Sequence, residues 1–277
     1  MIEGLTFGIM RKIFLLIAVL SLTTSSWAQN NKRLDNYLII PPEPKLYISS
    51  VDRYIAKKTG LSHAQIREGF RRELVKQLME DFMVLGKTQT LLSDSSEIYQ
   101  DLIYTYHSIG YKYEEVPQDE TVEVKTLDKT KDKVSKTFNK LIPKKEDNTE
   151  ELGPKREDKE HFMKTSIHSP YLLDNLHQKY GANRYVFINQ MDIKDEPKST
   201  YSYGTSEFVR VMRIHYTIMD QNGKILSAGL AKKEFSANLD NPKMIVKLTI
   251  PSISYFVTEK VRKVGEEGET QSEIDKL

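Results

Sequence analysis

The spacing of apolar residues predicts one long amphipathic helix over residues 62–84. Apolar side chains recur there at intervals of three and four residues, which places them on a single face of an α-helix. Ser62 and Gln65 have the spacing of a capping box, in which each side chain accepts a hydrogen bond from the other residue's backbone amide. Gly86 is expected to end the helix, because glycine readily adopts the left-handed conformation found after helix ends. The apolar face comprises Ile66, Phe70, Leu74, Val75, Leu78, Met79, Phe82 and Met83.

Prolines mark the beginnings of two further predicted helices, over residues 169–180 and 242–263. Pro170 and Pro242 stand near the first helical position, where the missing backbone N–H of proline breaks no hydrogen bond. Pro251 lies inside the second helix, where that donor is needed, so we expect a kink or a split near residue 250.

A fourth helix, predicted over residues 94–108, is rich in tyrosine. Tyr99, Tyr104 and Tyr106 lie within it, and Tyr111 follows. These rings would suit a stacking surface for a partner or a glycan. We prefer the simpler interpretation of an amphipathic helix that packs the rings and leaves the hydroxyl groups in water.

Runs of β-branched and aromatic residues predict strands in the rest of the chain. Asn222-Gly223 lies between two such runs and is typical of a hairpin with a type I′ turn, whose two central residues both need positive φ. Asp220 or Gln221 should therefore end one strand, and Lys224 should open the next. The predicted strands cover residues 45–51, 184–193, 207–219 and 224–235.

Together these elements predict an α+β fold, with a mostly antiparallel sheet packed by helices on one face. Its two parts are residues 29–111 and 166–264, separated by a charged insertion at residues 112–165 and followed by a flexible tail at 265–277. Residues 112–160 carry twelve basic and fourteen acidic side chains but few large apolar ones. Such a segment cannot bury enough apolar surface to offset its ordering entropy. We therefore expect a disordered insertion rather than a nucleic-acid or membrane patch.

The N-terminal region has the pattern of a Sec-type export signal. Two basic residues precede an apolar run over residues 13–22, and Ser26-Trp27-Ala28 fits a signal-peptidase site. We expect residues 1–28 to be a signal peptide cleaved after Ala28, which makes the mature protein periplasmic or otherwise exported. An N-terminal membrane anchor is the alternative, and it fits less well because the run is shorter than the roughly 20 residues that span a bilayer.

The composition of the chain excludes several classes of partner and of reactive site. Of the 277 residues 29% are charged, but the net charge is only +2, which excludes a strongly basic nucleic-acid binder. The chain has no cysteine, which excludes disulfides, thiolate metal sites, cysteine nucleophiles and a lipid anchor on an N-terminal cysteine. We also expect no transmembrane segment after signal cleavage.

No motif in the sequence indicates a reaction. The six histidines include no pair at the i, i+4 spacing of a zinc-binding helix, and phosphate-binding loops and serine nucleophile elbows are absent. We therefore expect no catalytic residue, no cofactor and no metal. Asp192, Asp195 and Glu196 would suit acid–base chemistry, but such clusters at strand ends more often cap loops. A pocket that joined His215 to Asp192 and another carboxylate would favour an enzyme.

The best candidates for partner binding surround the connection between two predicted strands. Ser199, Tyr201 and Tyr203 lie in this connection, and interaction loops are commonly presented in this way on a rigid sheet. Arg210 and Arg213 add basic side chains on the following strand. An ordinary polar hairpin tip is the alternative interpretation.

Two local patterns follow each other in the C-terminal part of the chain. The helix end Lys179-Tyr180-Gly181-Ala182 precedes the strand Arg184–Ile188, and the hairpin Asp220–Gly223 joins the next two strands. In this pattern residues 169–263 resemble the periplasmic α/β domain of the curli-secretion-protein-like family and the N-terminal domain of the TolB translocation protein. The resemblance implies a non-catalytic envelope domain that acts in assembly or complex formation. The chain departs from the family in lacking a cysteine for a lipoprotein anchor and hairpins suited to membrane insertion, so pore formation is not implied.

These features lead us to expect an exported, non-enzymatic protein of the cell envelope that acts in partner binding or in assembly of an envelope complex. Its partners would be envelope proteins or further copies of itself. The alternative is an exported hydrolase with a carboxylate or histidine site that is not visible as a motif. A third class, a ligand-binding module, would have one deep, mostly apolar pocket near the tyrosines.

Overall fold

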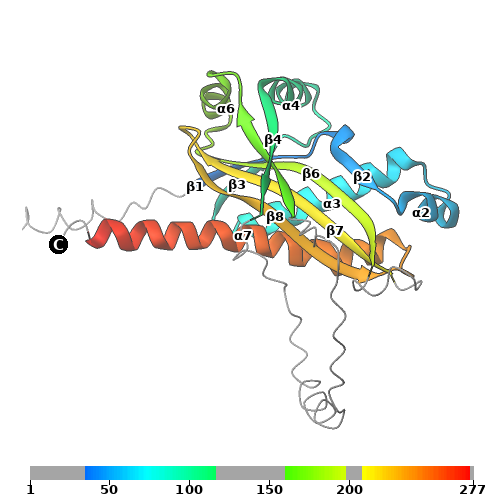
Figure 1. Ribbon diagram of the computed structural model, residues 1–277. Helices are drawn as coiled ribbons and strands as arrows, with labels where there is room; N and C mark the ends of the chain where they lie inside the picture. The colour runs from blue at the N-terminus through cyan, green and yellow to red at the C-terminus, as the bar shows by residue number, and fades with distance from the viewer. Residues whose placement is uncertain (1–34, 117–159, 198–207, 275–277) are drawn as a thin grey trace, which may run out of the picture. The chain divides into compact units, whose positions relative to one another are not determined.

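The computed structural model describes residues 35–116, 160–197 and 208–274 (Figure 1). The chain has the α+β fold expected from its sequence, with a mostly antiparallel, partly mixed sheet. The predicted signal peptide and most of the predicted charged insertion lie outside the described residues. In chain order the elements are β1 (Asp35–Ile40), the 3₁₀ turn η1 (Pro44–Leu46), β2 (Tyr47–Ser49), α2 (Asp52–Thr59), α3 (His63–Phe82), β3 (Gly86–Thr90), α4 (Ser96–Ser108), β4 (Ile109–Glu115), β5 (His161–Ile167), α6 (Leu172–Tyr180), β6 (Arg184–Pro197), β7 (Phe208–Asp220), β8 (Ile225–Ser236) and α7 (Pro242–Ile274).

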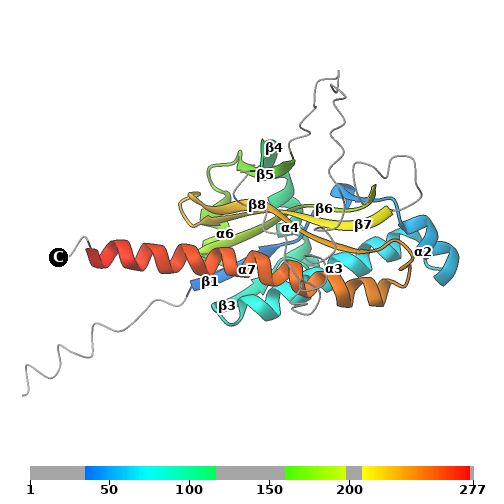
Figure 2. The ribbon, with the colours of Figure 1, turned by 60° about the horizontal axis from the view of Figure 1, so that its bottom comes forward.

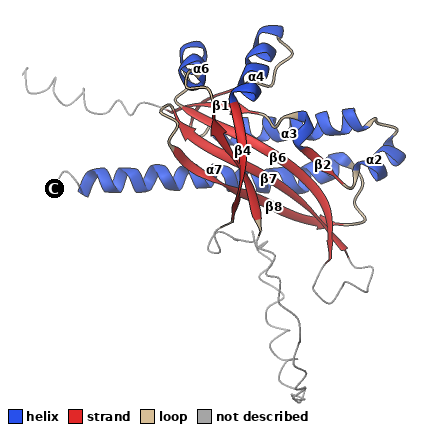
Figure 3. Ribbon diagram, turned by 45° about the horizontal axis from the view of Figure 1, so that its top comes forward, coloured by secondary structure: helices blue, strands red, loops and turns tan. Residues whose placement is uncertain are grey.

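The main sheet has the strand order β3-β1-β6-β7-β8, and β2 follows β1 along the same edge of β6 (Figure 3). The long strand β7 is antiparallel to both of its neighbours, β6 and β8, and the hairpin pattern in the sequence predicts its pairing with β8. β1 is parallel to β3 and to β6, and β2 is also parallel to β6. Parallel neighbours require a crossover connection, and helices α2 and α3 lie in the connection from β1 to β3.

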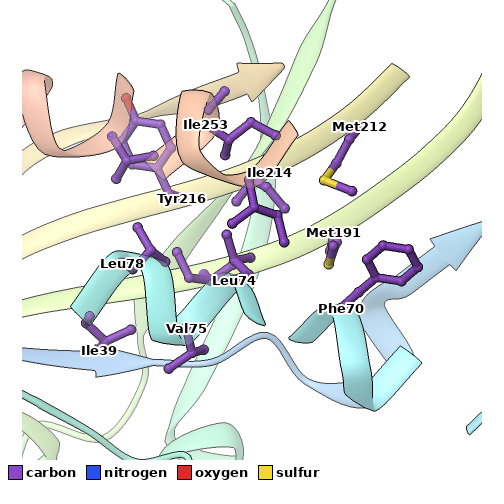
Figure 4. Close-up of a cluster of buried hydrophobic side chains, with 14 of the residues drawn as sticks. Ile39, Phe70, Leu74, Val75, Leu78, Met191, Met212, Ile214, Tyr216 and Ile253 are labelled. Atoms are coloured by element: carbon purple, nitrogen blue, oxygen red, sulfur yellow. The ribbon is translucent and has the colours of Figure 1, made fainter. Parts of the chain in front are cut away.

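The two faces of the sheet bury two separate apolar clusters. Side chains alternate along β1, so Tyr37 and Ile39 belong to one cluster whereas Leu38 and Ile40 belong to the other. Helices α3 and α7 cover the first face, and Figure 4 shows their side chains packed against those of the sheet. Helices α4 and α6 contribute to the second cluster, so the structure adds a smaller helical layer to the one that the sequence predicts.

Residues 45–51 form less strand than the sequence predicts. Only Tyr47–Ser49 pair with β6, because a 3₁₀ turn precedes them and helix α2 begins at Asp52. The Tyr47 hydroxyl donates a hydrogen bond to the Asp52 carboxylate at 2.7 Å. This carboxylate lies in the first turn of α2, where negative charge stabilises a helix.

Helix α3 begins where the sequence predicts but ends earlier. The Ser62 hydroxyl accepts a hydrogen bond from the Gln65 amide at 3.2 Å, and the Gln65 side chain accepts one from the Ser62 amide at 2.9 Å, so the capping box is confirmed. The helix ends at Phe82, and Gly86 opens strand β3 instead of capping the helix. A Cβ atom at position 86 would lie 2.0 Å from the backbone oxygen of Asp35 on the neighbouring strand, which is why glycine is needed there.

The hairpin between β7 and β8 is present, but its turn is not type I′. Gly223 has a φ of +78°, whereas none of the described non-glycine residues has a positive φ, Asn222 included. The Asp220 carboxylate accepts hydrogen bonds from the amides of Asn222 and Lys224, both at 2.9 Å. This side chain therefore stabilises a turn with one left-handed residue, and β8 starts at Ile225 after a local shift of register.

Helix α7 is continuous from Pro242 to Ile274. It continues through Pro251, where the sequence predicts a kink or split, and through most of the segment predicted as a loose tail. The missing N–H of Pro251 leaves the Lys247 carbonyl without its helical partner, but both residues are exposed, so this carbonyl can reach water. Ile250 and Ile253 on either side of Pro251 are buried and hold the helix against the sheet. In the part of the chain that the structure describes, no helix, α7 included, combines the length and apolar content needed to span a membrane.

Both ends of the predicted insertion are ordered as strands. The sequence predicts disorder over residues 112–165, whereas β4 extends to Glu115 and β5 begins at His161, and the two strands pair as an antiparallel ribbon. Phe162 and Met163 are buried. Burial of their apolar surface offsets the entropy lost when β5, at the C-terminal end of the predicted insertion, becomes ordered.

Candidate functional site

The β4–β5 ribbon stands on one face of the main sheet (Figure 2). Side chains of β6 and β7 hold it there. The amide of Met163 donates a hydrogen bond to His215 Nδ1 at 2.8 Å, and the amide of Thr165 donates one to Thr217 Oγ1 at 3.0 Å. Asn189 Nδ2 donates to the Met163 carbonyl at 2.6 Å. These three sheet side chains thus take the place that a further strand would occupy beside β5.

A β-bulge in β6 places two successive polar side chains under the ribbon. The register of β6 against β7 shifts between Ile188 and Gln190, so Asn189 and Gln190 both contact the ribbon instead of alternating between faces. Asn189 is fully buried and accepts a hydrogen bond from Thr165 Oγ1. Gln190 accepts one from the Tyr113 hydroxyl at 2.8 Å. The bulge therefore allows β6 to bind both strands of the ribbon.

His215 and Asp192 lie together beneath the ribbon. His215 Nε2 is 3.8 Å from Asp192 Oδ2, and each residue is only 3% exposed. Because His215 Nδ1 accepts the Met163 amide, Nε2 carries the proton of the neutral ring, and this buried atom has no hydrogen-bond partner among the described residues. Lys194 Nζ contacts the same Asp192 oxygen at 3.0 Å.

The pKa of Asp192 is lower than that of an exposed aspartate. Burial alone raises this pKa, but the nearby His215 ring, the hydrogen bonds from Gln190 and Lys194, and the positive charge of Lys194 outweigh the effect of burial. Gln190 Nε2 donates to Asp192 Oδ1 at 2.7 Å. Asp192 therefore stays ionised down to low pH, and a carboxylate with a lowered pKa is a weak general base.

A histidine beside a carboxylate is also the arrangement used in general acid–base catalysis. The structure does bring His215 and Asp192 together, but it does so under the ribbon. One ring nitrogen of His215 holds a backbone amide, and the other lies beyond hydrogen-bond distance from Asp192. Among residues 35–116, 160–197 and 208–274, no group of three His, Asp or Glu side chains is arranged to hold a metal ion.

An open groove lies beside the ribbon, next to the β7–β8 turn. Its volume is about 460 Å³, and neither His215 nor Asp192 lines it. Its rim is charged, because Glu114 and Lys164 form an ion pair there at 2.9 Å. The groove is open to solvent, unlike the deep pocket that a ligand-binding module would need. The apolar residues that line it are Ile167, Pro170, Met219 and Ile225.

Arg210, which the sequence suggests as a partner-binding residue, is buried on the face of the sheet covered by α3 and α7. It donates hydrogen bonds to Asp195 at 3.0 Å and to the Leu239 carbonyl at 2.7 Å. Its guanidinium group also lies 5.5 Å from the centre of the Tyr54 ring. Its charge and its donors are therefore used within the fold.

Arg213 lies on the opposite, ribbon-covered face and belongs to an ion-pair network. It donates to Glu160 at 3.3 Å and to Glu196, and Lys232 contacts Glu160 at 2.9 Å. Burial alone raises the pKa of Glu160, but the hydrogen bonds and charges of Lys232 and Arg213 outweigh it and lower the pKa overall. The network therefore ties the base of β5 to the sheet.

The structure does not join the predicted partner-binding residues into one surface. Arg210 and Arg213 lie on opposite faces of β7, and Ser199, Tyr201 and Tyr203 lie outside the described residues. The three carboxylates of the predicted acidic cluster likewise do not form one site, because each pairs with a different basic side chain. Its three members are Asp192, Asp195 and Glu196, bound by Lys194, Arg210 and Arg213 respectively.

One local signal of this site was present in the sequence. Asn189-Gln190 places two polar residues in succession after the apolar run Tyr185–Ile188, and such a break in alternation indicates a bulge. The roles of His215 and Thr217 had no local signal, because each binds a backbone amide 52 residues away along the chain.

Comparison with known proteins adds little to this description. No protein-family model and no curated protein sequence matches the chain. Solved structures that align with it include the hypothetical protein CT253 from Chlamydia trachomatis, at 8% sequence identity and a TM-score of 0.31, covering 83% of this chain and 96% of that one. A similarity of this size carries no argument about function.

Proposed function

We propose that this chain is an exported, non-enzymatic protein of the cell envelope that acts by binding protein partners within an envelope complex. The observation that carries the proposal is the role of His215 and Asp192. His215 and Asp192 are both buried. His215 binds the backbone of the ribbon, and Asp192 is ionised and bound by Lys194. The histidine best suited to catalysis thus holds a surface element in place, and the carboxylate beside it is bound by a lysine.

The β4–β5 ribbon, which His215 holds, is suited to contact other proteins. Two-stranded ribbons and exposed strand edges bind partners through their backbone groups. Tyr113 lies on the ribbon and is 58% exposed, and exposed tyrosine is enriched at protein interfaces. The charged rim of the neighbouring groove, formed by Glu114 and Lys164, adds polar contacts of the kind found around interface cores.

Export and an assembly role are supported by the sequence. Residues 1–28 have the features of a cleaved signal, and residues 169–263 resemble domains that act in envelope assembly. The elements α6, β6, β7, β8 and α7 occur along this stretch in the order that the resemblance implies.

The hydrolase alternative rests on the same His215–Asp192 pair and fits its surroundings less well. A substrate could reach the pair only if the ribbon left the sheet, which would break the hydrogen bond from Met163 to His215. The low pKa of Asp192 and its contact with Lys194 also oppose its use as a general base.

Two measurements on the full chain test the proposal. Mass spectrometry of protein recovered from the periplasm should show a mature chain that begins at Gln29. In-cell cross-linking followed by purification should recover a complex of fixed stoichiometry between this chain and a different envelope protein. A chain that stays uncleaved in the cytoplasm, or one that is never cross-linked to a different envelope protein, would overturn the proposal.

The substitution His215→Gln separates binding from catalysis. Glutamine keeps an acceptor for the Met163 amide but cannot transfer protons as imidazole does, so the recovered complex should be unchanged. Thr217→Ser is the matched control, because it keeps the hydroxyl acceptor on the same face of β7. A hydrolytic activity of the wild-type chain that His215→Gln abolishes without lowering the Tm would establish the hydrolase instead.

A further inference from the structure

Tyr111 and Tyr113 present backbone groups on the outer edge of β4 that no described strand pairs. Met163 and Thr165 of β5 direct their amides at the sheet, so the residues opposite them, Tyr113 and Tyr111, belong to the pairs that do not hydrogen-bond across the ribbon. The amide and carbonyl groups of Tyr111 and Tyr113 therefore point away from β5. No described strand pairs with this edge of β4, which lies beyond β5 from the main sheet (Figure 2).

The free edges of β3 and β8 are less suited to pairing with a second copy of the same strand. β3 is only five residues long, and β8 carries Lys232 and Lys233 in succession. Short edges and edges that carry like charges resist pairing with a second copy of the same strand. In β4, by contrast, a basic and an acidic residue flank the exposed ring of Tyr113.

Lys112 and Glu114 make this edge complementary to itself. If two copies pair in antiparallel fashion with Tyr113 opposite Tyr113, each Lys112 lies opposite Glu114 of the other copy. Tyr113 then belongs to a hydrogen-bonded pair, and the Lys112–Glu114 pairs are the close ones, with Cα atoms about 4.5 Å apart. A register with Lys112 opposite Lys112 would instead place like charges together, which is destabilising.

We propose that a second copy of this chain binds along β4 and forms a four-stranded sheet in the order β5-β4-β4-β5. Backbone hydrogen bonds of Tyr111 and Tyr113 join the copies, and the two Lys112–Glu114 pairs set the register. Glu114 also contacts Lys164 of its own chain at 2.9 Å, so the charges continue across the ribbon. The inference deepens the proposed function, on which it rests, by naming one of the partners.

Sedimentation equilibrium of the full chain tests the proposal. The wild-type chain should dimerise as its concentration rises. Lys112→Glu and Glu114→Lys each replace two favourable pairs with two like-charge pairs, so each should raise the dimer Kd by about 10- to 100-fold. Both side chains are on exposed residues, so circular dichroism and the Tm should show that each variant is folded.

Mixing the two variants provides the decisive measurement. Lys112→Glu carries two acidic residues and Glu114→Lys two basic ones, so the mixture should form a heterodimer although each variant alone is weakened. Lys87→Glu, on the exposed edge of β3, is the matched control and should dimerise like the wild type.

Three results would overturn the proposal: a wild-type chain that is monomeric at every concentration, a dimer that neither variant weakens, or a mixture that does not associate. These results are distinct from failure of the proposed function, which is judged by export and by recovery of a different envelope protein.

Discussion

At the scale of single residues, His215 determines how the ribbon is attached. It accepts the buried amide of Met163, and a buried donor that loses its acceptor costs about 1–3 kcal/mol. His215→Ala should therefore lower the free energy of unfolding by at least this amount in urea titrations. His63→Ala, at an exposed position, is the control and should change it little. Equal stability of the two variants would contradict the role given to His215.

Asp192 should make stability depend on pH. Its pKa is lower in the folded chain than the ordinary value of 3.8, so its ionised form stabilises the fold above that pH. This contribution should be lost as the pH falls from 3.8 through the lowered pKa. Asp192→Asn should be less stable than the wild type at neutral pH, by roughly 1–3 kcal/mol. The difference should shrink in acid, as measured by urea unfolding across pH, and a difference independent of pH would contradict this account.

At the scale of elements, the ribbon is a two-stranded sheet whose inner edge is paired with side chains. Thr217 accepts the amide of Thr165, so this amide should exchange slowly with solvent although no strand lies beside it. Thr217→Val removes the acceptor and should speed exchange of the Thr165 amide, whereas Thr217→Ser should preserve its protection. Hydrogen exchange followed by NMR measures both, and similar rates in the two variants would show that Thr217 does not hold β5.

The bulge in β6 is the element-scale feature that makes this attachment possible. Without the extra residue, Asn189 and Gln190 would point to opposite faces, and one of them would enter the apolar cluster beneath α3 and α7. The bulge therefore separates an apolar face, which stabilises the fold, from a polar face, which positions the ribbon.

At the scale of the whole molecule, the ribbon brings the end of β4 next to the start of β5, although the two lie far apart in the sequence. The Val116 amide donates a hydrogen bond to the Glu160 carbonyl at 2.8 Å, so a short turn can join them. Replacing residues 117–159 with a turn of about four residues should raise the free energy of unfolding by roughly 1–2 kcal/mol, because a shorter loop loses less entropy on closure. Urea unfolding compares the two chains, and a less stable shortened chain would show that the removed residues contribute contacts.

Local patterns in the sequence were sufficient to predict much of the fold. The apolar stripe and the capping box of α3, the long strands β6 to β8 and the position of their hairpin all follow from interactions between near neighbours. Where a prediction from local sequence was wrong, tertiary contacts outweighed the local preference of the chain. Pro251 did not split α7, because buried residues on both sides of it hold the helix on the sheet.

The sequence by itself determined the α+β class, the helix α3 and the antiparallel core of the sheet, because the periodicity of apolar residues is a local property. Only the tertiary structure decided that His215 and Asp192 lie together under a ribbon, that Arg210 and Arg213 face opposite sides, and that β4 has an open edge. Each of these depends on which distant segments pair. That pairing is set by the register of strands and the bulge in β6, which no single segment specifies.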